Sequence, residues 1–172
     1  DATVTVTQSP AAGTVITSST VVTLTATDDA GNTSTCTFSV IPTDTTVPTI
    51  TCPGNQSVSF SASCNYTLLN YTSLATTADN CDATVTVTQS PAAGTVITST
   101  TVVTLTATDD AGNTSTCTFN VIPTDTTVPT ITCPGNQNVS FSAACNYTLL
   151  NYTSLATTAD NCDATVTVTQ SP

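Results

Sequence analysis

The sequence predicts an all-β protein made of tandem, disulfide-stapled β-sandwich repeats. Three observations support this prediction: an internal repeat, a strand-like composition and a regular set of cysteines. The residues that follow Asp1 return at Asp82 and again at Asp163, so the period is 81 residues. When the chain is shifted by one period, the overlapping positions differ at four pairs, which are Ser19/Thr100, Ser39/Asn120, Ser57/Asn138 and Ser63/Ala144. Copies this alike are expected to serve the same role at each place in an array.

The period divides the chain into one complete copy and two parts. A complete module is expected at 46–126, preceded at 1–45 by the C-terminal part of one copy and followed at 127–172 by the N-terminal part of the next. The chain starts and stops within the period, so we expect it to be a window on a much longer polypeptide. Near-identical copies favour a spacing or force-carrying role, because a catalytic domain is rarely needed many times in one chain.

The amino-acid composition indicates the compartment in which the protein resides and excludes some classes of binding partner. Lys, Arg and His are absent and the net charge is −11, which excludes nucleic acid and anionic membrane surfaces as direct partners because both attract cationic side chains. No apolar run reaches the roughly 20 residues of a membrane-spanning helix, so direct membrane insertion is not expected. Eight cysteines, four in each period, indicate an oxidising extracellular compartment. Zinc is not expected, since no Cys-x-x-Cys pair occurs.

Within the complete module, alternating Val and Thr between turns that contain Pro or Gly predict a series of short strands. The first is expected at 49–52 and continues at 56–61, and the others are expected at 64–71, 83–89, 95–97, 102–108 and 114–122. Residues 73–80 are expected to form a loop and residues 109–113 a turn. In the last strand Cys117, Phe119 and Val121 share one face, while Thr-rich faces meet water. This pattern is typical of a β-sandwich whose small core is supplemented by disulfides.

Three segments of the period resemble a known module. Ile-Thr-Cys-Pro at 50–53, Asp-Asn-Cys at 79–81, and Thr-Ala-Thr-Asp-Asp-Ala-Gly-Asn at 106–113 followed by Cys-Thr-Phe are similar to the HYR (hyalin repeat) family. HYR modules are immunoglobulin-like, so the resemblance implies tandem immunoglobulin-like β-sandwiches. HYR arrays with additional cysteines, as in the giant SprB-type gliding adhesins of Bacteroidota, look similar to this chain. The resemblance therefore implies an extracellular filament, cell-surface or secreted, that serves adhesion and gliding motility.

The strand order predicts one disulfide within the module. In an immunoglobulin-like sandwich the first and last strands run parallel and start at the same pole, which brings Cys52 close to Cys117. The alternative is a bridge between Cys36 and Cys52 across the junction. However, a strand of about eight residues places Cys36 on the order of 25 Å from the boundary, whereas bridged Cα atoms lie within about 7 Å of each other. The bridge Cys52–Cys117 is therefore expected.

Elimination then pairs the remaining cysteines of each copy. Cys64 is expected to bond to Cys81, and Cys145 to Cys162, with the loop before Cys81 folding back to bring its partner close. The mates of Cys36 and Cys133 are expected upstream and downstream of this window.

Aspartates supply a candidate metal site. Those of the linker, of the loop before the third strand and of the last turn are expected to share one pole, next to the neighbouring module. The candidate ligands are Asp44, Asp79, Asp82, Asp109, Asp110, Asp125, Asp160 and Asp163. Clustered carboxylates suit Ca²⁺, which takes 6–8 oxygen ligands, so calcium is a candidate cofactor at inter-repeat junctions. The alternative is that these aspartates only close Asx-turns, for which Asp-Asp-Ala-Gly-Asn is well suited without a metal.

The linker also carries a candidate modification site. Asp-Thr-Thr at 44–46 and 125–127 resembles the O-glycosylation signal of Bacteroidota, which implies glycans on Thr45 and Thr126.

Catalysis is not expected, because no Ser, Thr or Cys has a basic partner that would activate it as a nucleophile. The favoured function is a structural repeat of a filament or adhesin stalk, whose partners are neighbouring repeats of the same chain. The alternative is a carbohydrate- or surface-binding module, in which Thr-rich strand faces contact surface polysaccharide. Lateral association with other filament copies is a third arrangement.

Overall fold

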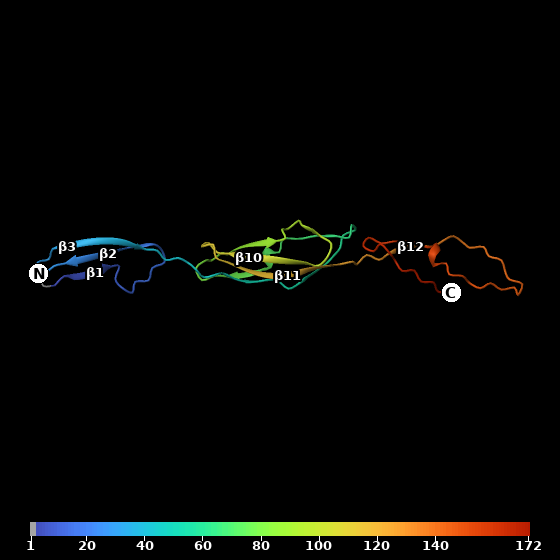
Figure 1. The fold of residues 1–172 in the computed structure, drawn as a ribbon, viewed down its shortest axis with the longest axis horizontal. Helices are drawn as coiled ribbons and strands as arrows, with labels where there is room; N and C mark the ends of the chain where they lie inside the picture. The colour runs from blue at the N-terminus through green and yellow to red at the C-terminus, as the bar shows by residue number, and fades with distance from the viewer. Residues whose placement is uncertain (1–2) are drawn as a thin grey trace. The chain divides into compact units, whose positions relative to one another are not determined.

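The computed structural model describes residues 3–172, whose ribbon is drawn in Figure 1. These residues form two compact units. The first unit extends to Thr46 and includes Asp110–Asn113, and the second consists of Val47–Asp109 and Thr114–Pro172. Residues 127–172 thus belong to the same unit as most of the complete module. Within residues 3–172, no helix has the length and apolarity that crossing a membrane requires.

The first unit contains one antiparallel sheet of three strands in the order β1-β2-β3. Its strands are β1 (Thr5–Ser9), β2 (Thr20–Thr27) and β3 (Thr33–Val40). β2 and β3 are joined by a tight turn in which Gly31 has a φ of +83°, a conformation that L side chains rarely adopt. The sheet repeats, one period earlier, the pairing of the last strands of the complete module.

The complete module is an all-β sandwich. Its strands are β4 (Thr49–Thr51), β5 (Gln56–Ser59), β6 (Tyr66–Thr67), β7 (Thr76–Ala78), β8 (Thr86–Ser90), β9 (Val96–Ile97), β10 (Thr101–Thr108) and β11 (Thr114–Thr124). A four-stranded sheet has the order β5-β11-β10-β8, and two strand pairs, β4–β7 and β6–β9, complete the fold. β10 and β11, the longest strands of the module, lie side by side in Figure 1.

Alternation along the two long strands builds the core. On β10, Val103, Leu105 and Ala107 are fully buried, while the intervening threonines remain partly exposed. On β11, Phe119 and Val121 are buried on the same face, as the period-two pattern predicted. The other half of the core includes Leu68 and Tyr71, and the Tyr71 ring meets that of Phe119 edge-on at a centroid distance of 5.3 Å. Burial raises the pKa of Tyr71 to about 12, since it disfavours the phenolate.

β5, which continues the chain from β4, and the last strand β11 are parallel neighbours. β11 pairs with β5, so that Val121 lies opposite Gln56 and Thr124 opposite Ser59. Cys52 and Cys117 each lie four residues before the pair Gln56 and Val121, and they are joined by a disulfide with a Cα–Cα distance of 5.7 Å. The structure therefore contains the intra-module bridge that the strand order predicted.

Two segments differ from the sequence prediction. The strand expected at 64–71 ends at Thr67, because the chain then turns into the 3₁₀ helix η1 (Thr72–Leu74). The loop expected at 73–80 contains β7, which pairs antiparallel with β4 so that Thr49 lies opposite Ala78. A three-residue strand flanked by polar residues has no distinctive periodicity, which is why the sequence pattern did not reveal it.

The last segment of the chain repeats only part of the module. It contains β12 (Thr130–Thr132), the 3₁₀ helix η2 (Thr153–Leu155) and β13 (Thr157–Ala159). β12 and β13 pair as β4 and β7 do, with Thr130 opposite Ala159. The copies of β5 and β6 do not form strands here, because the strands that pair with them lie in the other half of the period.

Candidate functional site at the junction between repeats

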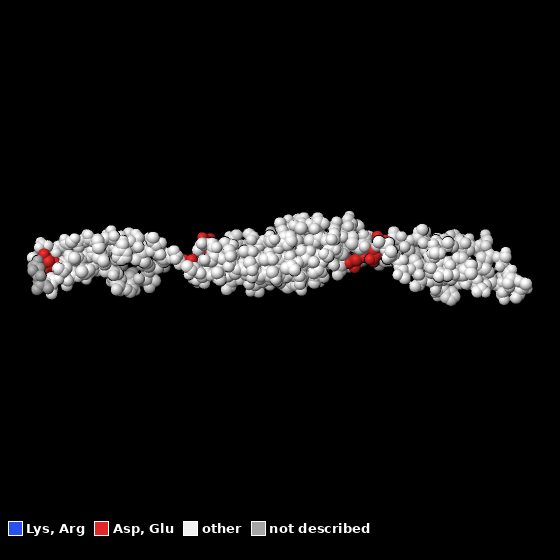
Figure 2. Space-filling view, in the orientation of Figure 1, with Lys and Arg blue, Asp and Glu red and all other residues white. Residues whose placement is uncertain are grey.

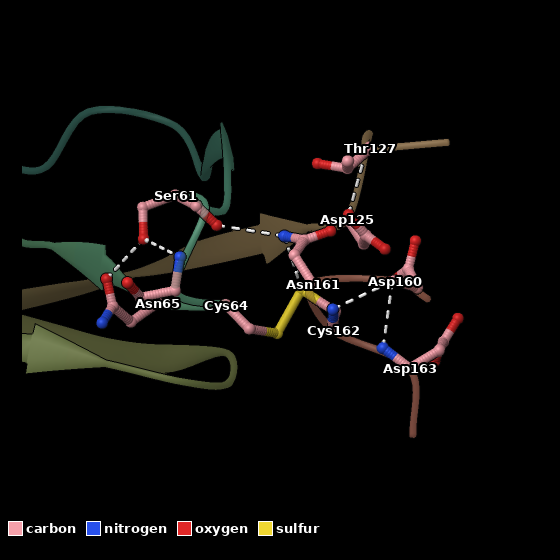
Figure 3. Close-up of a disulfide and its surroundings, with 10 residues drawn as sticks. Ser61, Cys64, Asn65, Asp125, Thr127, Asp160, Asn161, Cys162 and Asp163 are labelled. Atoms are coloured by element: carbon pink, nitrogen blue, oxygen red, sulfur yellow. Dashed lines mark hydrogen bonds between the residues drawn. A yellow bond between two sulfur atoms is a disulfide. The ribbon is translucent and has the colours of Figure 1, made fainter. Parts of the chain in front are cut away.

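A disulfide crosses the boundary between two copies of the repeat. Cys64 of the complete module is bonded to Cys162 of the next copy, with a Cα–Cα distance of 4.9 Å and a sequence separation of 98 residues (Figure 3). The predicted pairs Cys64–Cys81 and Cys145–Cys162 are therefore wrong. Both predictions assumed that each module closes all of its own bridges.

The strand directions explain this correction. Cys64 follows β5, and Phe60 donates to the carbonyl of Thr124, so the Cys64 turn lies at the pole where the module ends. Cys81 follows β7, which runs back along β4 to the pole where the module begins. About ten residues of extended chain separate the two poles, a distance on the order of 30 Å. A bridge needs Cα atoms within about 7 Å, so Cys64 cannot reach Cys81.

The Cys64 turn is closed by its own polar groups. The N–H of Cys64 donates to the Ser61 carbonyl at 3.0 Å, and the N–H of Ser61 donates to the Asn65 carbonyl at 2.7 Å. The Ser61 hydroxyl donates to Asn65 Oδ1 at 2.7 Å. Cys64 itself has a φ of +53°, which is uncommon for a residue with a side chain. The turn thereby presents the Cys64 sulfur at the end of the module.

The Cys162 loop docks on this turn by a second contact. Asn161 Nδ2 donates to the Ser61 carbonyl at 3.1 Å, beside the disulfide (Figure 3). The loop is held by Asp160, whose Oδ1 accepts from the N–H of Cys162 at 2.9 Å and from that of Asp163 at 3.0 Å. These two hydrogen bonds lower the pKa of Asp160, because they stabilise its carboxylate. The junction is thus both covalent and hydrogen-bonded.

Three aspartates gather next to this loop. Carboxylate oxygens of Asp125, Asp160 and Asp163 lie within 4.8 Å of one another. The linker is turned toward them by Asp125, whose Oδ1 accepts from the N–H of Thr127 at 2.9 Å. Asp160 Oδ2 is shielded from solvent and accepts no hydrogen bond from the described residues. Because the sequence has no Lys or Arg, no side-chain cation is available to neutralise this charge.

A second acidic group lies at the start of the complete module. Carboxylate oxygens of Asp79, Asp82 and Asp109 are also within 4.8 Å of one another, and Asp109 is 5% exposed. Asp79 accepts from the N–H groups of Cys81 and Asp82 at 2.9 and 3.1 Å, as Asp160 does one period later. Figure 2 shows the acidic side chains gathered into a few small patches on an otherwise uncharged surface.

Two predicted ligands remain, Asp110 and Asp44. Asp110 is exposed. Asp44 belongs to the first unit, where its Oδ1 accepts from the N–H of Thr46 at 3.0 Å. Within the second unit, the structure brings six of the eight predicted aspartates into two groups of three, each of which has the oxygen chemistry that Ca²⁺ prefers. Calcium binding at these groups stays a prediction.

One aspartate turn is closed by hydrogen bonds within the turn itself. Asp28, one period before Asp109, accepts at Oδ1 from the N–H groups of Ala30 and Asn32, at 3.0 and 2.8 Å. The Asn32 side chain donates to Asp28 Oδ2 at 2.8 Å. These bonds, led by the one from the Asn32 side chain, lower the pKa of Asp28. The turn-closing role of the Asp-Asp-Ala-Gly-Asn sequence is therefore realised at this copy.

The candidate glycosylation sites are accessible. Thr45 and Thr126 are both exposed, and each follows an aspartate that accepts from the N–H two residues on. Their modification stays a prediction.

Comparison with known protein families gives one match, which covers most of the complete module. Residues 43–122 match the family model of the HYR domain, an extracellular repeat module of the adhesion type. The match supports the HYR resemblance over residues 43–122, and the flanking segments repeat parts of this sequence. A search of curated proteins found no significant match.

Proposed function

We propose that this chain is a structural segment of a long extracellular filament or adhesin stalk, in which the repeats set length and carry tension. The observation that carries this proposal is the disulfide Cys64–Cys162, because it joins one copy to the next outside the peptide linker. A stalk of this kind would extend an adhesive tip from a cell surface, as in the gliding adhesins that the sequence resembles.

The internal architecture of the module supports a mechanical role. β5, near the start of the module, and β11, at its end, are parallel neighbours, so tension between the two ends of the module pulls them in opposite directions along their length. The hydrogen bonds between β5 and β11 then bear the tension at the same time, rather than breaking one after another. The disulfide Cys52–Cys117 limits this sliding, because it fixes the start of β11 to the chain that leads into β5.

At the junction between the complete module and the next copy, two covalent connections share the tension. The linker 125–129 joins β11 to β12 through the main chain, and the disulfide Cys64–Cys162 joins the same two copies in parallel. Residues between Cys64 and Cys162 are therefore protected from extension while the bridge is intact.

Single-molecule stretching of the chain by its two ends tests this role. Reduction is expected to add about 330 Å of contour length, since it returns the 98 residues between Cys64 and Cys162 to the stretched path at about 3.4 Å each. The Cys64→Ser variant keeps only the bridge Cys52–Cys117, which encloses 65 residues, so its gain on reduction is expected to fall to about 220 Å. Equal lengths with and without reductant would exclude a force-carrying role for the bridges.

A cellular experiment tests the location. An antibody raised against the purified chain is expected to label intact cells that produce the parent protein, or the filaments they release. Labelling that requires cell lysis would contradict the proposal.

A second candidate, polysaccharide binding, is favoured by rows of hydroxyl groups on the four-stranded sheet. Thr88, Thr106 and Thr116 lie opposite one another across β8, β10 and β11, and Thr86, Thr108 and Thr114 form the next row. These side chains are partly or fully exposed. If they bind sugars, the chain should sediment with an insoluble polysaccharide and the Thr106→Val variant should remain in solution. No sedimentation with plant, fungal or bacterial wall polysaccharides would remove this candidate.

A further inference from the structure

We infer that the bridge observed between Cys64 and Cys162 recurs at the next junction of the array, where Cys145 bonds to the following copy at the cysteine one period beyond Cys162. The partner is a second copy of the same repeat. Successive modules then form a covalent ladder, in which each junction has a disulfide beside the peptide linker. The bridge is a feature of the covalent structure alone, so its presence can be tested separately from the proposed function.

The bonding partner of an equivalent cysteine is the main support for this inference. Cys145 is the copy of Cys64 one period later, and it is exposed and outside any disulfide. Cys64 is bonded to a cysteine 98 residues further along the chain. The same separation from Cys145 reaches beyond Pro172, into the copy that would follow.

The Cys145 turn already has the conformation of the bonded turn. Cys145 has a φ of +54°, compared with +53° for Cys64. Its N–H donates to the Ser142 carbonyl at 2.9 Å, and the Ser142 hydroxyl donates to Asn146 Oδ1 at 2.6 Å. These bonds match those of the Cys64 turn, so the thiol is presented without rearrangement and little conformational entropy is lost on bonding.

The other half of the junction is also preformed. The loop at 79–82 has the same hydrogen bonds as the loop at 160–163, with Asp79 accepting from Cys81 and Asp82 at 2.9 and 3.1 Å. Asn80 Nδ2 approaches Cys81 Sγ at 3.0 Å, as Asn161 Nδ2 approaches Cys162 Sγ at 3.3 Å. A following copy would therefore present its cysteine in the geometry that Cys162 has in the bridge.

The bond forms by ordinary thiol–disulfide exchange. The two cysteine thiols each give up a proton and together two electrons, and a disulfide oxidant, such as a thiol–disulfide oxidoreductase in its oxidised form, accepts them and leaves as a dithiol. One S–S bond forms in the array while one breaks in the oxidant.

A tandem chain tests the inference directly. Residues 1–162 followed by a second copy of 1–172 preserve the period, since residue 163 repeats residue 1, and place Cys81 of the second copy 98 residues after Cys145 of the first. Because the sequence has no Lys or Arg, Thr46→Lys in the second copy creates a single trypsin site in the linker of the new junction. The tandem chain is oxidised with glutathione disulfide, digested under native conditions and examined on gels with and without reductant.

We expect the cut tandem chain to migrate as one species without reductant and as two fragments with it. Cys145→Ser in the first copy should make nearly all of the cut chain separate without reductant. The matched control, Thr127→Lys in the first copy in place of the Thr46→Lys site, tests the junction already seen bridged and should stay joined in both backgrounds. If the control stays joined but the new junction separates in the Cys145 chain, the inference is wrong.

Discussion

The complete module and the two partial copies share nearly the same sequence, yet their apolar side chains are buried to very different extents. Phe119 is 4% exposed in the complete module, whereas Phe38, one period earlier, is 49% exposed. Leu68 is 1% exposed and its copy, Leu149, is 55% exposed. Burial in this protein is therefore a property of the whole period, because each half supplies only one side of the core.

The cysteine turns behave differently. The Cys64 and Cys145 turns have the same φ and the same Ser–Asn hydrogen bonds, although only the first is bridged and only the first belongs to a complete module. Short-range polar contacts thus determine these turns, while long-range packing determines the core. The turn that presents the cysteine therefore forms in a copy of the repeat even where its cysteine is not bonded to a neighbouring copy.

The largest difference in the free energy of unfolding is expected when the phenylalanine found at the same position of the repeat, Phe119 or Phe38, is replaced by alanine. Phe119→Ala is expected to reduce the free energy of unfolding by about 3–5 kcal/mol, since it removes a buried ring and leaves a cavity. Phe38→Ala should cost less than about 1 kcal/mol, because the ring is half exposed already. Urea denaturation of both variants measures the difference. Equal losses would show that the partial copy has a core of its own.

Replacing cysteines at equivalent positions of the complete and partial copies should also change the stability by different amounts. Cys52→Ser removes the bridge to Cys117, which closes 65 residues, and should cost about 2–4 kcal/mol. Cys133→Ser, one period later, should leave the midpoint of urea denaturation unchanged, because Cys133 is outside any disulfide in residues 3–172. A destabilised Cys133→Ser chain would mean that this thiol has a partner of its own in the folded state.

Calcium should stabilise the acidic groups if they bind it. At a free concentration one hundred times the Kd, a single site would add about 2.7 kcal/mol to the free energy of unfolding. Thermal melting in calcium and in chelator measures the effect. Asp160→Asn should reduce it, whereas Asp110→Asn, at an exposed position outside the group of three, should not. Superimposable melting curves would show that the aspartates only close turns.

The smallest effect concerns the pH dependence of one turn. Hydrogen bonds led by that from Asn32 lower the pKa of Asp28, so the stabilisation they provide is present above the unfolded pKa of about 4 and is lost as the pH falls through the lower folded pKa. Carboxyl NMR titration should place the midpoint of Asp28 below the usual aspartate range. Asn32→Ala should return it toward that range, and an unchanged midpoint would rule out the Asn32 contact as the cause.

The sequence predicted the sandwich correctly because its signals are strong. Period-two alternation in β10 and β11 is long enough to define an inward face, and the parallel arrangement of first and last strands led to the bridge Cys52–Cys117. The junction was predicted less well. Asp125, Asp160 and Asp163 were expected to gather and do so, but the disulfide beside them was assigned within the module.

The error at the junction has a physical origin. The segment before Cys81 was expected to be a loop that folds back, whereas it contains β7, whose pairing with β4 carries Cys81 to the far pole. Three residues of Thr and Ala carry no periodic signal that separates strand from loop. Elimination among cysteines also assumes that all partners lie in one module, and a repeat array offers each cysteine an equivalent partner in the next copy.

If the disulfide Cys64–Cys162 holds two repeats together independently of the linker, the two copies should stay joined after the linker is cut by limited proteolysis. Thr127→Lys gives the chain its single trypsin site, between Cys64 and Cys162. After cleavage under native, oxidising conditions, residues 1–127 and 128–172 should remain one species and separate only when reductant is added. Cys64→Ser in the same background should let them separate without it. Release of residues 128–172 from the Cys64 chain without reductant would contradict the account.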